Sequence, residues 1–262
     1  MPMFIGTSGW QYADWRDMIY SGVPQRLWLE RYCDVFATVE NNNAFYRLPA
    51  RETFESWRQR TSGDFVMAVK ASRFLTHIKR LKDPEEPVER LMGVAEGLGR
   101  KLGPVLLQLP PTLRADAERL RRCLTRFPKK VRIAVEPRHE SWWTDEIREI
   151  LAERGAALCW ADRLGRPQSP LWRTADWIYL RLHEGRGRTW PSYGEQALKS
   201  WLNRLREAGD VRDAYVYFNN DRGGAAVRNA LTLALLAEDA GWDVSRVRQL
   251  DEIESTHAGG RP

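Results

Sequence analysis

The stretch "IAVEPRHESWW", residues 133–143, joins an apolar start to a charged end. Its first three residues are small or β-branched, which is typical of a buried strand. Glu136, Arg138 and His139 then follow within four residues, ahead of two tryptophans. Because buried charges are costly unless they are paired or face a ligand, this stretch predicts a polar site at the end of a strand.

Seven other segments share this layout, a short apolar run that ends in polar residues: 3–10, 37–45, 64–72, 104–111, 156–162, 176–183 and 214–221. Helical patterns separate most of them, and this alternation of strand and helix predicts an α/β fold. Eight such units in a chain of 262 residues fit a (β/α)8 barrel of the TIM type. Only about 13 residues separate Asp162 from Asp176, and two are prolines, so we expect the sixth helix to be short or missing.

We expect one barrel domain over residues 1–248, followed by a frayed C-terminal tail at 249–262. The alternative is a doubly wound open sheet. That alternative is disfavoured because no GxGxxG motif follows the first predicted strand.

The composition limits the class of protein. No apolar run reaches about 18 residues, so no membrane span is expected. The three cysteines are widely spaced and form no CxxC pair, which favours a reducing cytoplasm. The net charge of +6 allows nucleic acid as a partner, although the basic residues are spread along the whole chain.

Side chains alternate along a strand, which assigns one face of each predicted strand to the barrel interior. In residues 131–138 the bulky apolar positions are 131, 133 and 135, so Glu136 and Arg138 should point inward. Extended to all strands, the rule predicts an inward ring of Glu40, Lys70, Gln108, Glu136, Arg138, Asp162, Arg181 and His183, with Asn219 and Asp221 on the last strand.

This ring has two interpretations. One is a self-satisfied network in which three acids balance three bases. The other is a ligand site, which is favoured because a buried ionic network need not stabilise a fold better than apolar packing would.

An anion is the predicted ligand. The loops after the seventh and eighth strands, "HEGRGRTW" (183–190) and "NNDRGGAA" (219–226), match the place where such barrels commonly hold phosphate. The loop "SRFLTHIKRLK" (72–82) is also basic, and aromatic side chains nearby could stack on a nucleotide. The predicted substrate- or anion-binding residues are Lys70, His77, Arg138, Arg181, Asn219, Asn220, Arg222, Tyr12 and Trp10.

Acid–base chemistry is predicted at the same ring. A carboxylate beside a cation keeps a low pKa and can act as a base, and a histidine can act as the acid. The predicted catalytic residues are Glu136, Asp162, His183 and Glu40.

A divalent metal is the disfavoured alternative, and no cofactor is expected. Its ligands would be Glu40, Glu136, His139 and Asp162. The three cations of the same ring would repel a metal ion, so we expect a metal-free site.

Seven ordered motifs resemble the YecE-like family, domain of unknown function 72. They are "GTSGWQY" (6–12), "ENNNAFYRLP" (40–49), "VKASRFLTH" (69–77), "GPVLLQLPP" (103–111), "VEPRHESWW" (135–143), "LRLHEG" (180–185) and "YVYFNND" (215–221). The resemblance covers about residues 3–240 and implies a TIM-type barrel. It implies no established reaction.

Together these observations predict a cytoplasmic protein with an anion- or phosphate-binding pocket at the C-terminal ends of the strands. An enzyme, hydrolase- or lyase-like, acting on a phosphorylated or nucleotide-type substrate is favoured. The alternative is a non-catalytic module that binds an anion or nucleic acid.

Overall fold

The strands form one curled, largely parallel sheet within the computed structural model, which describes residues 2–249. The strand order is β6-β5-β4-β3-β2-β1-β10-β9-β7-β8. The long members are β1 (Pro2–Ser8), β2 (Thr38–Asn41), β3 (Val66–Lys70), β4 (Leu102–Gln108), β5 (Ile133–Glu136), β7 (Trp160–Arg163), β9 (Ile178–Leu182) and β10 (Ala214–Phe218). Three two-residue strands complete it: β6 (Ala157–Leu158), β8 (Arg166–Pro167) and β11 (Asp243–Val244). The eight predicted apolar runs therefore all contain strands.

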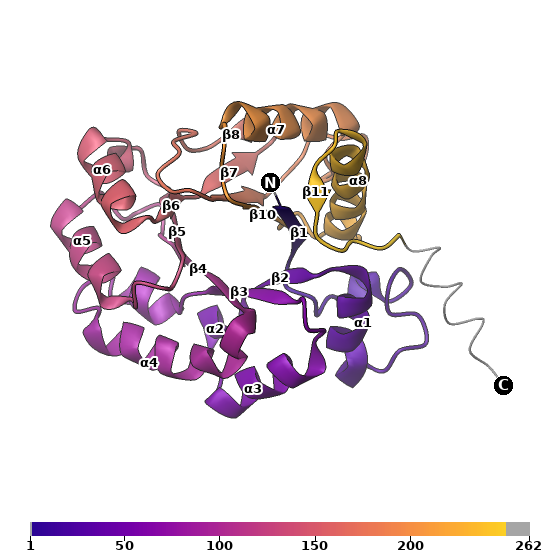
Figure 1. Cartoon of the computed structure of the whole chain (residues 1–262), viewed down its shortest axis with the longest axis horizontal. Helices are drawn as coiled ribbons and strands as arrows, with labels where there is room; N and C mark the ends of the chain where they lie inside the picture. The colour runs from indigo at the N-terminus through magenta and orange to yellow at the C-terminus, as the bar shows by residue number, and fades with distance from the viewer. Residues whose placement is uncertain (1, 250–262) are drawn as a thin grey trace.

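Helices surround the sheet on its outer side, as Figure 1 shows. They are α1 (Trp28–Val35), α2 (Asn43–Tyr46), α3 (Arg51–Arg60), α4 (Glu85–Ala95), α5 (Ala117–Arg126), α6 (Asp145–Arg154), α7 (Glu195–Glu207) and α8 (Ala225–Asp239). Short 3₁₀ or π turns are η1 (Ala13–Trp15), η2 (Gln25–Leu27), η3 (Phe74–Ile78), η4 (Glu96–Lys101) and η5 (Glu140–Trp142). The mixed α/β fold predicted from the alternation is confirmed.

The sixth helix is missing, as predicted. No helix lies between β7 and β9, where the chain instead forms the short antiparallel β7–β8 pair. Side chains from this segment satisfy strand groups that lack other partners: Thr174 Oγ1 donates to Ala156 O and accepts from Leu158 N. Ser169 Oγ donates to Cys159 O at 3.0 Å, between β6 and β7. These hydrogen bonds tie the segment between β7 and β9 to the strands that it covers.

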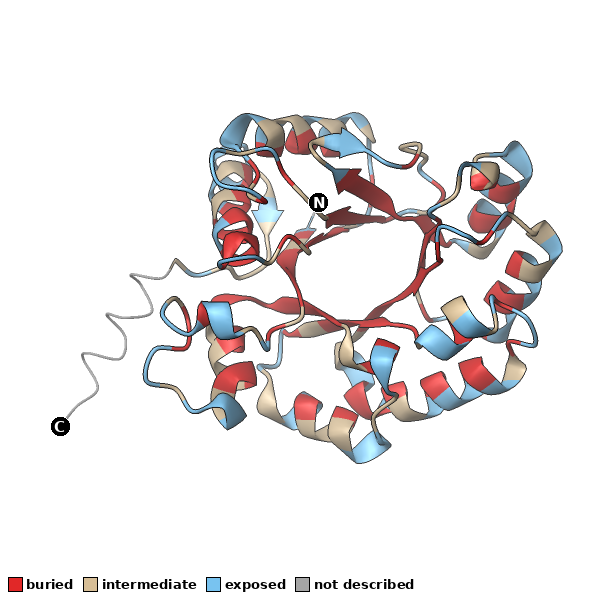
Figure 2. Ribbon diagram, turned by 180° about the vertical axis from the view of Figure 1, so that it is seen from behind, coloured by how far each residue is buried: buried red, intermediate tan, exposed pale blue. Residues whose placement is uncertain are grey.

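The two faces of the sheet carry different side chains. The outer apolar cluster takes Ile133 and Val135 from β5 together with helix residues, whereas Ala134 belongs to a second, inner cluster. On β9, Leu180 is outward and Tyr179 inward in the same way. The long strands are mostly buried, whereas the two-residue strands β8 and β11 are largely exposed, as Figure 2 shows. The predicted phases of these two strands are confirmed.

The predicted frayed tail, 249–262, lies outside the described residues from residue 250 onward.

Candidate functional site

Five polar residues lie at or near the C-terminal ends of five strands and converge in the interior. They are Glu40 on β2, Lys70 on β3, Gln108 on β4, Glu136 on β5 and Arg181 on β9. Each is buried, with at most 8% of its surface exposed. Because parallel strands place their carboxyl ends at the same edge, an inward side chain near each end brings these groups together.

Glu40 is fully buried and fully hydrogen-bonded. Its Oε1 accepts from Ser8 Oγ and from Arg181 Nη2, both at 2.8 Å. Its Oε2 accepts from Tyr179 OH at 2.7 Å. Burial raises the pKa of Glu40, but the charges of Arg181 and Lys70 outweigh it, so the pKa lies below its ordinary value.

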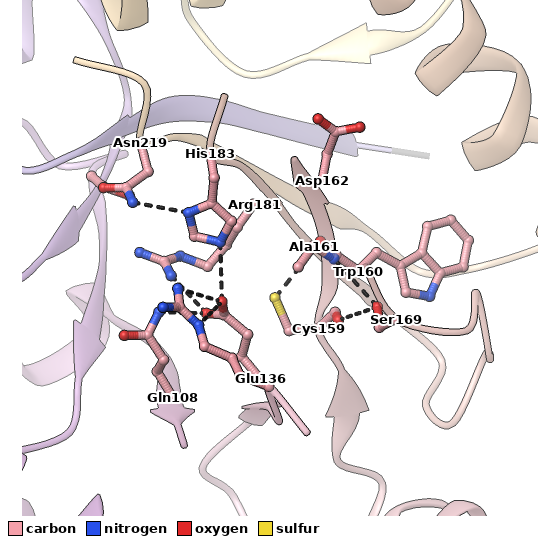
Figure 3. Close-up of polar contacts among 12 residues, drawn as sticks. Gln108, Glu136, Cys159, Trp160, Ala161, Asp162, Ser169, Arg181, His183 and Asn219 are labelled. Atoms are coloured by element: carbon pink, nitrogen blue, oxygen red, sulfur yellow. Dashed lines mark hydrogen bonds and ion pairs between the residues drawn. The ribbon is translucent and has the colours of Figure 1, made fainter. Parts of the chain in front are cut away.

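Glu136 has even more donors, as Figure 3 shows. Its Oε2 accepts from Arg181 Nη1 at 2.6 Å and from Gln108 Nε2 at 2.9 Å. Its Oε1 accepts from Arg138 Nη2 and from His183 Nε2, both at 3.0 Å. Burial raises the pKa of Glu136, but Arg181 and His183 more than offset this and hold the pKa well below its usual range. Glu136 is therefore an ionised carboxylate with no acceptor site left open.

Arg181 bridges the two carboxylates. Its Nη1 and Nη2 are bound to Glu136 and Glu40, and only 1% of its side chain is exposed. Its Nε is buried without a hydrogen-bond partner among residues 2–249. Since both terminal nitrogens are already committed, Arg181 acts as the counter-ion of two buried acids rather than as a free anion clamp.

His183 is oriented by hydrogen bonds at both ring nitrogens. Asn219 Nδ2 donates to Nδ1 at 3.0 Å, so the ring proton lies on Nε2, which donates to Glu136. Burial lowers the pKa of His183, although Glu136 opposes the effect. The imidazole is therefore held neutral in a single tautomer. Glu40, Gln108, Glu136, Arg181 and His183 are hereafter called the ring network.

Lys70 lies beside the ring network but is not part of it. Its Nζ lies 4.0 Å from the centre of the Phe45 ring. No carboxylate of the described residues lies within ion-pair distance of it, and no hydrogen bond to it is found there. Burial and the charge of Arg181 lower its pKa to about 8, although Glu40 and Glu136 oppose the shift. Lys70 is thus a largely buried residue whose Nζ bonds no group of residues 2–249, and Nζ is not among the fully buried unpaired side-chain atoms there, so solvent can reach it.

Two further basic groups lie near Lys70. Arg138 is 40% exposed and reaches Glu136 from the rim. His77, in η3, bonds Thr76 Oγ1 through Nδ1 and packs edge-on against Phe45. Burial lowers the pKa of His77, and the charges of Lys70, Arg73 and Arg138 lower it further. This region of the site is therefore positive.

The prediction that Asp162 joins the ring is wrong. Its Oδ1 accepts from Tyr193 OH at 2.5 Å and its Oδ2 from Trp201 Nε1 of α7 at 3.0 Å, away from Glu136 (Figure 3). The reason is the phase of the strand: Ala157 and Cys159 face the inner cluster and Leu158 and Trp160 the outer one, so Asp162, two residues after Trp160, faces outward. Burial raises the pKa of Asp162, and its three donors only partly offset this.

In the predicted anion site on the seventh and eighth loops, the protein itself uses one backbone donor. Gly223 N, just before α8, donates to the Asp14 carboxylate at 2.8 Å. Asn220 is buried and binds Pro191 O and Asn229 Oδ1. Arg222 is exposed and packs over Trp190. The Asp14 carboxylate thus takes one donor that was proposed for a phosphate, and Asn220, Arg222 and Gly223 have no hydrogen bond to the ring network.

Asp221 was also predicted to face the ring, and this was wrong. Its Oδ1 accepts from Trp15 Nε1 at 2.5 Å, and burial raises its pKa to about 6. The rim aromatics serve the core as well: Trp10 is 3% exposed and packs edge-on against Trp57. Tyr12 donates to Ser8 O and packs against Trp15. Trp10 therefore has no free face for a ligand.

His139 and the metal alternative also find no support. His139 Nδ1 accepts from Ser141 N and so caps the start of η5. No group of three or more His, Cys, Asp or Glu side chains that could hold a metal ion occurs in the part of the chain that the structure describes.

Two members of the site were not proposed from the sequence. Ser8 and Tyr179 donate to Glu40. The alternation along β9 predicts that Tyr179 points inward, but an inward tyrosine among apolar neighbours is equally typical of core packing.

A separate, open cavity of about 750 Å³ lies at the other end of the strands. It is lined by residues at strand starts, such as Leu102 and Arg132, and by the exposed Lys130, but by no member of the ring network. No helix of residues 2–249 is long and apolar enough to cross a membrane.

Comparisons with known proteins all point to one family. Residues 4–252 match the model of the "Protein of unknown function DUF72" family. The UPF0759 protein YunF of Bacillus subtilis is 27% identical over 285 residues, covering 95% of this chain and 99% of YunF. The UPF0759 protein YecE of Escherichia coli K12 is 27% identical over 154 residues, 58% of this chain and 54% of YecE. That alignment thus spans about half the length of YecE.

Solved structures of the same kind share the fold. A DUF72 family protein from Thermotoga maritima is 28% identical with a TM-score of 0.75, covering 91% of this chain and 100% of that one. Another from Enterococcus faecalis has a TM-score of 0.77 at 19% identity, covering 90% and 95%. Neither description states a reaction.

Proposed function

The chain belongs to the DUF72 family of proteins of unknown function, and from that starting point we propose that it binds a phosphorylated or otherwise anionic small molecule. The binding residues in this proposal are Lys70, Arg138 and His77, at the C-terminal ends of β3 and β5 and on η3. The observation that carries it is the buried Lys70 ammonium, which has no carboxylate partner among the described residues.

The charge balance supports this proposal. Arg181 is shared by Glu40 and Glu136, and Arg138 also reaches Glu136. With Lys70 protonated, three cations face two carboxylates, which leaves one positive charge uncompensated. A largely buried charge without an anionic partner is costly, and an anionic group beside Lys70 and Arg138 would relieve that cost.

We further infer that the sheet closes as a (β/α)8 barrel. β6 pairs with β5, and β7 pairs with β9, so Cys159 alone separates the two halves of one strand. Cys159 N also donates to Val135 O on β5. In a closed barrel, Lys70 and the ring network occupy the end at which such enzymes hold their active sites.

We favour an enzyme over a binding module, and a lyase over a hydrolase. The ring network holds a neutral, oriented imidazole beside a cationic region, which is more organisation than anion capture alone requires. A hydrolase needs a base for its water, yet both buried carboxylates already accept from several donors. A non-catalytic anion or nucleic-acid module is the alternative. The three cysteines are free and buried, which supports a reducing compartment such as the cytoplasm.

Anion titration of matched lysine variants tests the proposal. Inorganic phosphate is titrated into the wild type, Lys70→Met and Lys82→Met by calorimetry. Loss of one charge-assisted contact predicts about tenfold to hundredfold weaker binding for Lys70→Met. Lys82 is exposed, so Lys82→Met should match the wild type. Equal affinity in Lys70→Met and the wild type, or no anion binding by the wild type, would contradict the proposal.

The pH dependence gives a second test, with sulfate as a probe whose own charge does not change. Binding requires the ammonium form of Lys70, whose pKa is lowered to about 8. Affinity for sulfate should therefore be retained below pH 8 and fall as the pH rises through and above that value. Lys70→Met should show no such step.

A further inference from the structure

The lysines of the described residues differ in the partners of their ammonium groups. Lys101 is partly buried, and its Nζ donates to Arg58 O, Thr61 O and Thr61 Oγ1. Lys199 pairs with Glu195, and Lys79 with Asp83. Lys70 is more buried than these and is given only the face of an aromatic ring. Its surroundings suit a neutral amine with an available lone pair as well as they suit a cation.

We propose that Lys70 is a nucleophile that forms a Schiff base with the carbonyl carbon of an aldehyde or ketone substrate carrying an anionic group. This inference rests on the proposed anion site and assigns its chemistry: Arg138 and His77 hold the anionic group of the substrate, and Lys70 Nζ is the member of the site that attacks the carbonyl carbon. The position is favourable because Lys70 ends β3, at the end of the sheet where the ring network lies, and its Nζ lies 4.0 Å from the centre of the Phe45 ring.

The step balances without a cofactor. The neutral amine nitrogen attacks the carbonyl carbon, a C–N bond forms, and a carbinolamine results. The C–O bond then breaks, and the oxygen leaves as water with the two hydrogens of the amine. Nothing is oxidised or reduced, and protonation of the imine gives an iminium that can withdraw electrons from the neighbouring carbon.

The electrostatics of the site fit both stages. Burial and Arg181 lower the pKa of Lys70 from 10.5 to about 8, which raises its neutral fraction at pH 7 by roughly 300-fold. Glu40 and Glu136 act in the opposite direction and favour positive charge on the same nitrogen. They would therefore stabilise the iminium once it has formed.

Reductive trapping tests the inference on the full chain. Pyridoxal 5′-phosphate is the probe, because it carries both an aldehyde and a phosphate, and borohydride fixes any imine. The chain has seven lysines, at positions 70, 79, 82, 101, 129, 130 and 199. Trypsin does not cleave after a modified lysine, so label on Lys70 is read by mass spectrometry in the peptide 61–73.

At pH 7 and limiting probe, we expect Lys70 to be labelled at least about tenfold faster than Lys130, which is exposed at the other end of the strands. Inorganic phosphate should protect Lys70 and leave Lys130 unchanged. Pyridoxal, which lacks the phosphate, should label Lys70 more slowly. Label spread evenly over the lysines, or none on Lys70, would overturn the inference.

The variant Lys70→Arg separates the two proposals, because it keeps the charge and removes the nucleophile. It should lose the label in the peptide but keep phosphate affinity within a few-fold of the wild type. If the wild type binds phosphate but is not trapped at Lys70, the Schiff-base inference fails and the anion site stands. If Lys70 is trapped equally fast with and without the phosphate group and phosphate gives no protection, the anion site fails. The protection experiment uses the wild type alone, so it does not depend on folding of the variant.

Discussion

At the scale of single residues, the site depends on one shared counter-ion. Arg181 neutralises two buried glutamates that belong to different strands, and its side chain is 1% exposed. Two carboxylates this close would repel each other strongly without it. The charges of the ring network therefore depend on one another. The two carboxylates stabilise the buried guanidinium of Arg181, and Arg181 allows both glutamates to stay ionised while buried.

Arg181→Met should destabilise the protein by about 3–5 kcal/mol, because it leaves buried carboxylates without their partner. The free energy of unfolding in urea at pH 7 measures this. Arg163→Met is the matched control: Arg163 also pairs with a glutamate, Glu184, but is 64% exposed. It should cost at most about 1 kcal/mol. Similar costs for the two variants would show that the buried network contributes no more than a surface pair.

Acid should weaken the same network. The pKa of Glu136 lies well below its usual value in the folded protein. A depressed carboxyl pKa contributes stability that is present above the unfolded value, near 4.5, and is lost as the pH falls through the folded value. In Glu136→Gln the free energy of unfolding should therefore fall less between pH 5 and pH 3 than in the wild type. A parallel decline in both proteins would contradict this assignment.

At the scale of elements, Asp162 anchors the loop after β9, and its side chain makes no hydrogen bond to the ring network. Its carboxylate ties Tyr193, on that loop, to Trp201 on α7. Tyr193 OH also accepts from Glu184 N at 3.0 Å. One hydroxyl therefore joins β7 to both ends of the loop at 184–193.

Tyr193→Phe should destabilise the protein by about 1–3 kcal/mol, because a buried carboxylate oxygen and an amide each lose a partner. Tyr46→Phe is the control, since Tyr46 is 80% exposed and its loss should cost little. Urea unfolding compares the two. Phosphate affinity should be the same in Tyr193→Phe as in the wild type, because Asp162 lies outside the ring network. A large loss of phosphate affinity in Tyr193→Phe would indicate that Asp162 contributes to anion binding.

At the scale of the whole molecule, the net charge of +6 leaves open whether the ligand is a small anion or a nucleic acid. Many arginines already pair with neighbouring acids, as Arg122 and Arg126 do with Glu85. In our proposal one uncompensated positive charge lies in the site, beside Lys70, while the other basic residues are spread along the whole chain.

We therefore expect only weak, salt-sensitive binding of a single-stranded oligonucleotide, in the range of about 10⁻⁴–10⁻⁶ M at physiological salt. Fluorescence anisotropy at two salt concentrations measures it. Combined substitution of Lys79, Arg80 and Lys82 by alanine should leave phosphate affinity unchanged. Tight oligonucleotide binding that this triple variant abolishes would instead favour the nucleic-acid module.

The sequence by itself determined the strands, the helices between them, the missing sixth helix and the inward phase of β5 and β9. These follow from local periodicity, since alternation and chain length between runs are properties of neighbouring residues. They were enough to bring Glu40, Lys70, Glu136 and Arg181 to one end of the sheet, where the structure confirms that they converge.

Only the tertiary structure decided which of these groups is free. Both carboxylates are saturated because Arg181 reaches them from a third strand, and that saturation is what leaves Lys70 without a partner. Asp14 binds Gly223 N across 209 residues, which no local pattern could indicate. Asp162 faces outward because it shares the phase of Leu158 and Trp160, and its partners Tyr193 and Trp201 come from later segments of the chain. Charge pairing depends on distances between segments remote in sequence, and folding alone sets those distances.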